Sequence, residues 1–73
     1  GGYMAKYITF EDSKEKFDGK PIYNCFSKRD RFCLAEVFWY KPWKQWTCRF
    51  NPNSVWSEDC LEDVRKFILL LGA

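Results

Sequence analysis

The 73-residue chain contains no histidine, and no two of its four cysteines stand two to four positions apart. A Ser-His-Asp set is therefore excluded, and the ligand spacing of a zinc knuckle is missing. The sequence has only four glycines and no glycine-rich phosphate loop. The acidic residues near the C-terminus follow the pattern of a solvated helix face. We therefore expect a protein that is not an enzyme, with no catalytic residues, no cofactor and no metal site.

Long hydrophobic runs are also missing. The longest apolar run, Phe67 to Leu71, is far shorter than the ~20 residues that a membrane-spanning helix needs. We therefore expect no membrane insertion. Gly1-Gly2-Tyr3, before Met4, resembles an expression-tag remnant, and no signal peptide is recognised. The expectation is a single small domain, residues 4–73, that works in the cytoplasm.

Aromatic residues are abundant: seven Phe, four Tyr and four Trp make up 21% of the chain. Each buried aromatic side chain removes roughly 150–250 Å² from water, which helps so short a chain to build a core. A compact domain of this size does not have the interior volume to bury all of them. Some are therefore expected at the surface, which is a first indication of a binding site.

The cysteines lie within apolar patterns rather than in glycine-rich loops, at Cys25, Cys33, Cys48 and Cys60. We favour small buried thiols in a reducing cytoplasm, because unpaired cysteine is among the most buried residue types. An even number of cysteines in a short chain also permits a disulfide framework, which is the alternative. A metal site is the least favoured of the three interpretations.

Charge is unevenly distributed, although the net charge is only +2. Residues 20–50 contain seven basic and two acidic side chains, a net charge of +5. Residues 51–73 contain two basic and four acidic side chains, a net charge of −2. The basic middle region is compatible with an anionic partner, but the total is far from that of a dedicated nucleic-acid-binding protein.

Several segments have the β-branched and aromatic composition of strands: residues 4–10, Ile22–Ser27, Phe32–Tyr40 and Gln45–Phe50. The polar segment Glu11–Lys20 is predicted to be a loop, with Asp18-Gly19 as a turn signal. A short helix around Ser13–Phe17 and the arm of a hairpin are the alternatives. Residues 28–31 are predicted to form a charged turn. Pro42 cannot donate a hydrogen bond to a strand ladder, so the longest predicted strand should end just before it.

A helix is predicted after Trp56. Ser57 is a good N-cap, and the acidic residues that follow it suit the positive end of the helix dipole. Apolar side chains recur at helical spacing on one face: Cys60, Leu61, Val64, Phe67, Ile68 and Leu71. Gly72 is placed to end the helix. The sequence therefore predicts an α+β fold, a three-stranded or four-stranded antiparallel meander packed against one C-terminal helix.

Alternation along the strands assigns the two sheet faces. The face expected under the helix carries Cys33, Ala35, Val37, Trp39, Trp46, Cys48 and Phe50. The opposite face carries aromatic residues beside polar ones: Glu36, Phe38, Tyr40, Thr47 and Arg49. In one interpretation the N-terminal segment around Tyr7–Phe10 folds across this second face and buries its aromatic residues. In the other, the face is open and serves as a binding platform.

The candidate binding site combines the open face with the tip of the hairpin: Phe38, Tyr40, Lys41, Trp43, Lys44 and Arg49. Trp43 lies at the tip between two lysines and has little core to pack against. Exposed aromatic side chains beside basic ones can stack on bases or anchor a protein partner. Leu69 and Leu70 lie off the main stripe of the helix, as residues of a frayed end or as a small patch for a partner.

The element order, together with Lys41-Pro42-Trp43-Lys44-Gln45-Trp46, resembles DNA-binding domains built on a three-stranded sheet, such as plant AP2-type domains and the arm-binding domains of some integrases. This resemblance implies Arg and Trp side chains that enter the major groove, but the run of sheet arginines is reduced here to Arg49. The short chain, with Asn51-Pro52 and then Cys60-Leu61 opening a helix, is also similar to small phage and prophage proteins. That similarity implies a stoichiometric effector.

Two functional hypotheses follow. The first is a non-enzymatic protein-binding module, of a phage or mobile-element type, that occupies a host protein stoichiometrically. The second is a nucleic-acid-binding domain that uses the basic hairpin and the open sheet face. The salt dependence of binding separates them, because binding to phosphates weakens steeply as the salt concentration rises.

Overall fold

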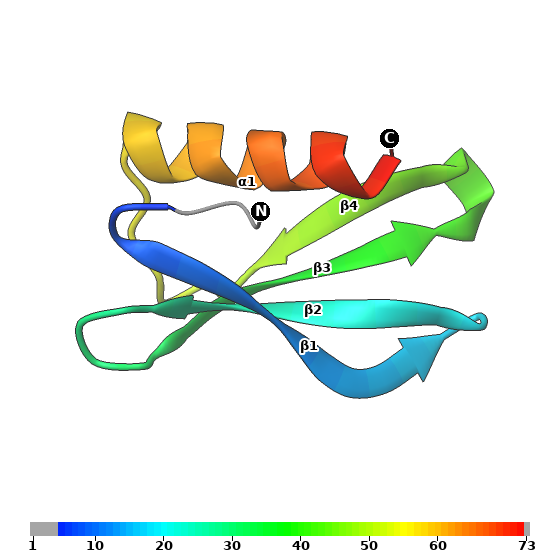
Figure 1. The fold of residues 1–73 in the computed structure, drawn as a ribbon, viewed down its shortest axis with the longest axis horizontal. Coiled ribbons are helices and arrows are strands. Elements are labelled where there is room, and N and C mark those ends of the chain that lie inside the picture. Colours follow the sequence, from blue (N-terminus) through cyan, green and yellow to red (C-terminus); the bar gives the residue numbers. More distant parts are fainter. Residues whose placement is uncertain (1–4, 73) are drawn as a thin grey trace.

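The computed structural model describes residues 5–72, which form four strands followed by one helix (Figure 1). The strands are β1 (Ile8–Phe17), β2 (Lys20–Ser27), β3 (Cys33–Tyr40) and β4 (Gln45–Phe50), a 3₁₀ turn η1 (Lys41–Trp43) joins β3 to β4, and the helix is α1 (Glu58–Gly72). Each strand pairs antiparallel with the next, in the order β1-β2-β3-β4. The predicted α+β fold, an antiparallel meander packed against one C-terminal helix, is confirmed, with the fourth strand present.

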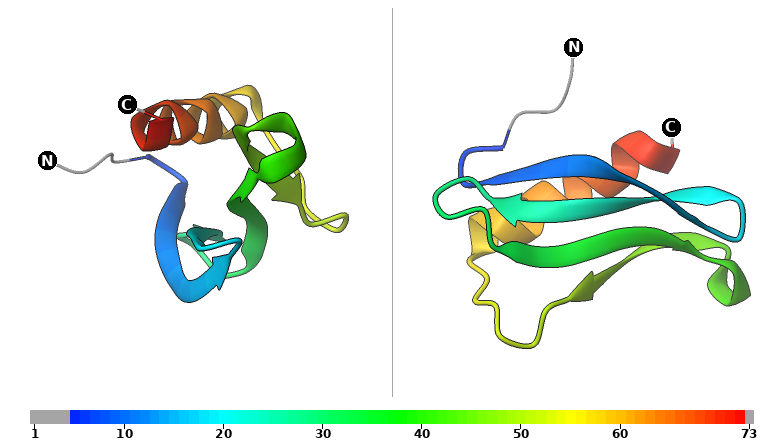
Figure 2. Two further views of the ribbon diagram at one scale, coloured as in Figure 1. Left: turned by 90° about the vertical axis from the view of Figure 1, so that its right-hand side faces the viewer. Right: turned by 90° about the horizontal axis from the view of Figure 1, so that it is seen from below.

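The sheet is strongly twisted and curved, and α1 lies across its hollow side (Figure 2). Seen from the end, β1 and β4 rise on opposite sides of the sheet toward the helix. We call the side under α1 the concave face and the other side the convex face. Within residues 5–72 no helix covers the convex face (Figure 2).

The predicted loop over Glu11–Lys20 is wrong, because β1 continues to Phe17 and forms a hairpin with β2. The turn is Asp18-Gly19, as the sequence indicated, with positive φ angles of 52° and 79°. A tight hairpin turn needs this backbone conformation, and glycine adopts it at little cost. The charged composition of this segment is not typical of a strand, so the sequence did not indicate one. Between Asp12 and Lys16 the register shifts, and the residues between them leave the ladder as a bulge.

The other predicted strands are confirmed to within two residues, and β4 has the predicted bounds. The strand expected over residues 4–10 begins only at Ile8. Residues 28–30 form the predicted turn, in which Arg31 N–H donates to Ser27 O (2.9 Å) and Phe32 N–H donates to Asp30 Oδ1 (3.1 Å). Residues 1–4, which include the expected tag remnant, and residue 73 lie outside the described part of the chain.

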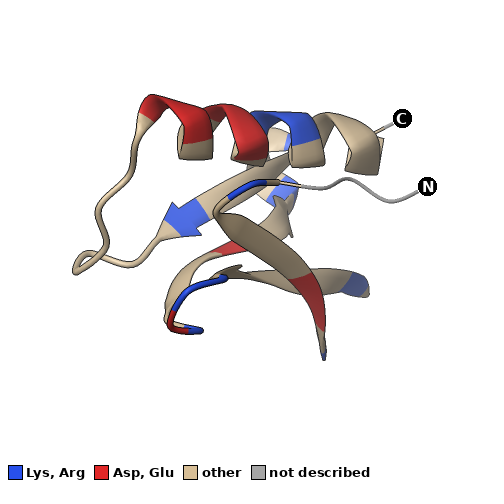
Figure 3. Cartoon of the chain, turned by 60° about the vertical axis from the view of Figure 1, so that its left-hand side comes forward, with Lys and Arg blue, Asp and Glu red and all other residues tan. Residues whose placement is uncertain are grey.

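Helix α1 begins at the predicted cap. Ser57 Oγ accepts a hydrogen bond from Cys60 N–H (3.2 Å), which satisfies a backbone donor of the first turn. Acidic residues occupy the first turns, where the helix dipole favours negative charge, and basic residues follow them in the middle of the helix (Figure 3). Gly72 is the last helical residue. The predicted apolar stripe is right except at Leu61, which is 47% exposed.

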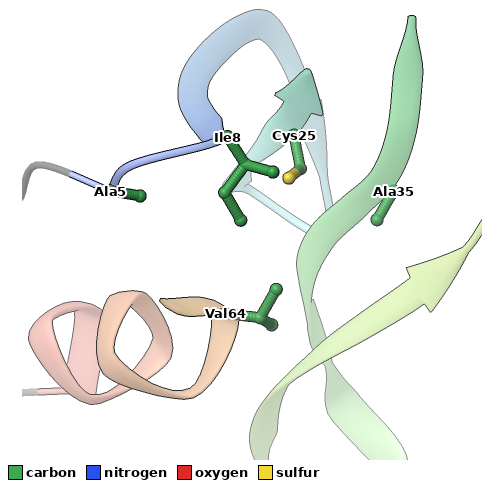
Figure 4. Close-up of a cluster of buried hydrophobic side chains, with 5 residues drawn as sticks. All are labelled: Ala5, Ile8, Cys25, Ala35 and Val64. Atoms are coloured by element: carbon green, nitrogen blue, oxygen red, sulfur yellow. The ribbon is translucent and has the colours of Figure 1, made fainter. Parts of the chain in front are cut away.

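The core lies between α1 and the concave face (Figure 4). Its buried side chains come from the N-terminal segment, the three N-terminal strands and the helix: Ala5, Ile8, Cys25, Ala35 and Val64. Phe67 of α1 stacks on Phe10 of β1, with ring centroids 4.1 Å apart and planes 3° from parallel. The edge of the Phe67 ring also meets Tyr23 of β2 (5.3 Å, 80°). These small residues and stacked rings fix the helix over the sheet.

Most residues predicted to lie under the helix do so. Ala35 and Val37 are buried, and Cys48 packs against the core. Phe50 differs: it is 41% exposed and packs edge-on against Trp56, with centroids 4.6 Å apart. Phe50 stands at the end of β4, and its aromatic partner comes from the loop that precedes α1 rather than from the helix.

The interpretation in which Tyr7–Phe10 crosses the convex face is wrong. This segment leads into β1, which pairs beside β2, and Phe10 points to the helix side, where it stacks on Phe67. Backbone pairing requires the segment to lie in the plane of the sheet, so it cannot also cover one of its faces. The convex face of β3 and β4 is therefore open.

Candidate functional site

The connection between β3 and β4 positions the tip of the hairpin. The strand ends at Tyr40, and a single 3₁₀ turn, Lys41–Trp43, follows with Pro42 near its start. Proline lacks the backbone N–H that a further ladder bond would need, so the strand ends here. Lys44 closes the turn in a left-handed conformation (φ 52°), and its N–H donates to Lys41 O (3.1 Å). This turn folds the Trp43 ring back against Tyr40.

Four aromatic side chains run along the open side of the sheet, and we call them the aromatic row: Phe17, Phe38, Tyr40 and Trp43. Each ring meets the next edge-on, with centroids 6.1, 6.4 and 4.9 Å apart and planes at 79°, 86° and 85°. Phe38 and Tyr40 are half-buried, whereas Trp43 is 67% exposed. Edge-on contacts hold the rings in fixed orientations and leave their outer surfaces available to a partner.

Arg49 lies beside this row on β4. Its guanidinium carbon is 5.1 Å from the centroid of the Phe38 ring, a cation–π contact. The ion pairs described within residues 5–72 join Arg31 to Glu11 and Arg65 to Glu62, so no carboxylate there pairs with Arg49. Its side chain lines adjoining hollows of about 140, 290 and 350 Å³. Arg49 is therefore the exposed positive charge around which the open surface is arranged.

The predicted site residues do not all come together. Phe38, Tyr40, Trp43 and Arg49 line one hollow of about 350 Å³, as the sequence indicated. Lys41 is exposed in the turn. Lys44 instead lines a different hollow of about 370 Å³, beside the C-terminal end of α1. Of the two lysines, therefore, neither lines the hollow that holds Phe38, Tyr40, Trp43 and Arg49.

The sequence interpretation missed Phe17. Its ring extends the aromatic row and, with Ile22, lines the smallest of the hollows at Arg49. Part of the signal was present, because Asp18-Gly19 directly follows Phe17 and is typical of a hairpin turn. Assigning this stretch to a loop removed Phe17 from consideration.

A second arginine–aromatic contact was also missed. The Arg31 guanidinium lies 4.5 Å from the centroid of the Phe26 ring and forms a two-pronged pair with Glu11, at 2.6 and 3.1 Å. The hydrogen bond from Arg31 holds the pKa of the Glu11 carboxyl below its ordinary value and raises the pKa of Arg31. Because Arg31 and Glu11 already neutralise each other, a binding partner would find less unpaired charge in this cluster than at Arg49.

All four cysteines are unpaired thiols in the structure. Cys25 is fully buried in the core, and burial raises its pKa to about 12, with smaller contributions from the other three cysteine thiols and from Asp63. Burial also raises the pKa of Cys48 to about 11. A thiol with so high a pKa is almost wholly protonated near neutral pH and is a poor nucleophile. Among residues 5–72 no three side chains of ligating type are arranged to hold a metal ion.

No helix in the described part of the chain combines the length and the hydropathy needed to cross a membrane. The chain matches no protein-family model, no curated protein and no solved structure. Its functional interpretation therefore depends on the surface around the aromatic row and Arg49.

Proposed function

We propose that the chain is a non-enzymatic protein-binding module that occupies its partner stoichiometrically through the aromatic row and Arg49. The carrying observation is the exposed Trp43 at the end of the row, close to an arginine with no carboxylate partner in residues 5–72. Trp, Tyr and Arg are the residues that most often dominate the energetics of protein interfaces. Their pre-ordered rings lose little conformational freedom on binding, which favours affinity.

Nucleic acid is the second candidate, because an arginine beside stacked rings can also contact a phosphate and a base. Two observations make it the weaker one. Glu36 is the direct cross-strand neighbour of Arg49 and lines the same hollow, where its carboxylate would repel a phosphate. Lys44 borders a different hollow, so it does not line the hollow that Arg49 shares with the aromatic row. The four free thiols support a reducing compartment such as the cytoplasm as the place of action.

The test compares three baits in a cell lysate, with and without nuclease: the wild type, Trp43→Ala, and Leu69→Ala as a matched control. Leu69 is also exposed (57%) but lies on α1, away from the aromatic row. We expect a protein retained by the wild type and by Leu69→Ala, in the presence of nuclease, to be lost with Trp43→Ala. Retention that survives Trp43→Ala would contradict the proposal.

Affinity measured on the isolated pair makes the test quantitative. A Trp anchor contributes about 2 kcal/mol or more, so Trp43→Ala should weaken binding at least ~30-fold while the protein stays folded. If the partner were a nucleic acid, Lys41→Gln with Arg49→Gln would flatten the slope of log affinity against log salt by about two units. With a protein partner the salt slope should change much less.

A further inference from the structure

The two edge strands of the sheet differ in their capacity to accept another strand. β1 and β4 each pair with one neighbour only. The N-terminal half of β1, residues 8–12, pairs with β2 in regular register, but the register then shifts between Asp12 and Lys16, and Lys14 has a positive φ of 69°. Asp12 Oδ1 and Ser13 Oγ accept hydrogen bonds from the backbone N–H groups of Lys14 and Glu15 (2.8 and 3.1 Å). A charged, bulged edge of this kind resists pairing with another chain.

The β4 edge is regular. Its six residues pair with β3 without a register shift, from Tyr40↔Gln45 to Ala35↔Phe50. Asn51 N–H donates to Leu34 O (2.8 Å), which continues the same register. Bonded and non-bonded pairs alternate in an antiparallel ladder, so the backbone groups of Trp46, Cys48 and Phe50 are directed away from β3. Within residues 5–72 no backbone bond is described from these three residues to another segment.

The charge beside this edge indicates what kind of strand fits. From Val37 to Phe50 the hairpin contains Lys41, Lys44 and Arg49 and no acidic residue. The side chain of Arg49 lies on the convex face, over Phe38, directly beside the unpaired edge. Glu36 of β3 is the cross-strand neighbour of Arg49. A strand added to β4 would place alternate side chains on the other side of Arg49, one strand further from the Glu36 carboxylate. Paired with a second copy of this chain, the edge would bring two such basic hairpins together, which like-charge repulsion opposes.

We propose that β4 accepts an extended, acidic segment of the protein partner as a fifth strand, with a carboxylate of that segment at Arg49. This inference rests on the proposed function and adds the form and charge of the partner. Main-chain hydrogen bonds to Trp46, Cys48 and Phe50 supply affinity that is independent of sequence. The pairing of a carboxylate with Arg49 selects acidic segments, and the adjoining hollows receive the side chains beside it.

The probe is a short blocked peptide of alternating glutamate and valine, titrated into isotope-labelled full-length protein up to millimolar concentration. We expect amide hydrogen exchange at Trp46, Cys48 and Phe50 to slow at least tenfold at saturation. The amides of Thr47 and Arg49 already bond to β3 and should change little, so they serve as internal controls. Absence of binding, or binding without protection of the three outward amides, would overturn strand addition.

Matched ligands and variants test separately the backbone hydrogen bonds to β4 and the selection of acidic segments by Arg49. The same peptide with alternate N-methylated amides should lose at least tenfold in affinity, because it cannot donate to the edge. Arg49→Glu should weaken binding of the acidic peptide at least tenfold and make a lysine–valine peptide the tighter ligand. Lys66→Glu makes the same change of charge on the exposed surface of α1 and should leave both affinities unchanged.

The remaining outcomes separate this inference from the proposed function. Equal affinity for the acidic and basic peptides, or protection of the three amides by dimerisation of the protein alone, would overturn the acidic partner strand. Neither result would alter the loss of partner retention expected for Trp43→Ala. If instead Trp43→Ala retains the partner while the peptide results hold, the proposed function of the aromatic row fails and β4 addition stands.

Discussion

Replacing Phe67 by alanine tests the packing of the helix on the sheet. The ring stacks on Phe10 and meets the edge of Tyr23, so the truncation removes two aromatic contacts and leaves a cavity between α1 and the concave face. Truncating a buried Phe to Ala costs about 3–5 kcal/mol, and each aromatic pair contributes about 0.5–1.5 kcal/mol of such totals. Phe67 is half-buried, which indicates the lower end of the range, about 3 kcal/mol.

The stability lost in Phe67→Ala is a large share of the protein's total free energy of unfolding. A domain of 73 residues has a free energy of unfolding of about 4–11 kcal/mol at ~0.05–0.15 kcal/mol per residue. A loss of 3 kcal/mol should lower the melting temperature by about 12–24 °C, at ~4–8 °C per kcal/mol. Thermal and urea melts of Phe67→Ala measure both quantities. Leu69→Ala, two positions along the same helix, should cost less than ~1 kcal/mol because Leu69 is 57% exposed.

A double-mutant cycle with Phe10→Ala isolates the stacked pair. The coupling energy between Phe10 and Phe67 should be about 0.5–1.5 kcal/mol in favour of the pair. If Leu69→Ala destabilised the protein more than Phe67→Ala, the face of α1 that packs on the sheet would have been assigned wrongly. A coupling near zero would show that the two rings stabilise the domain independently.

Two further predictions concern the thiols and the first hairpin. Cys25 should resist a thiol reagent in the native protein at pH 8 and react fully after denaturation, and any disulfide seen by mass measurement of the unreduced protein would contradict the free thiols. Because burial raises the pKa of Cys25 to about 12 and of Cys48 to about 11, the unfolded chain releases these protons first. The free energy of unfolding should therefore be unaffected below the ordinary thiol pKa of about 8.5 and should fall as the pH rises from there toward 12, which urea melts across that range would measure. Gly19→Ala should cost about 1–2 kcal/mol in a urea melt, since its φ is +79° and no atom within 4 Å would meet the added methyl group; an unchanged midpoint would show that the turn relaxes to another conformation.

Local signals explain what the sequence predicted well. Ser57 and the acidic residues after it specify a helix start within one turn, and the structure has the helix begin there. β4 alternates apolar and polar residues between a proline-bearing turn and Asn51-Pro52, so its bounds could be read from neighbouring residues. Trp43 was predicted to be exposed because a residue at the hairpin tip has little core to pack against, and it is exposed.

The features that were missed depend on contacts distant in the sequence. β1 contains charged residues that propensity assigns to a loop, and only pairing with β2 makes them a strand. The contact of Phe17 with Phe38 joins positions far apart in the chain, so no local pattern reveals it. The location of Lys44 depends on one left-handed residue, which the sequence Lys41–Lys44 does not announce. Local chemistry thus predicted the elements, and tertiary pairing decided the extent of the site.

The bulge in β1 also limits the size of any assembly built through this sheet. Open-ended stacking into a filament requires each added unit to present a fresh receptive edge to the next one. Here the far side of the sheet ends in a strand that is interrupted by a bulge, in which Asp12 and Ser13 already accept hydrogen bonds from the amide groups of Lys14 and Glu15. A strand that joins β4 therefore finishes the ladder at that side, and on the other side the bulge cuts the regular edge short after Asp12. The expected product is a closed complex with one partner strand per chain.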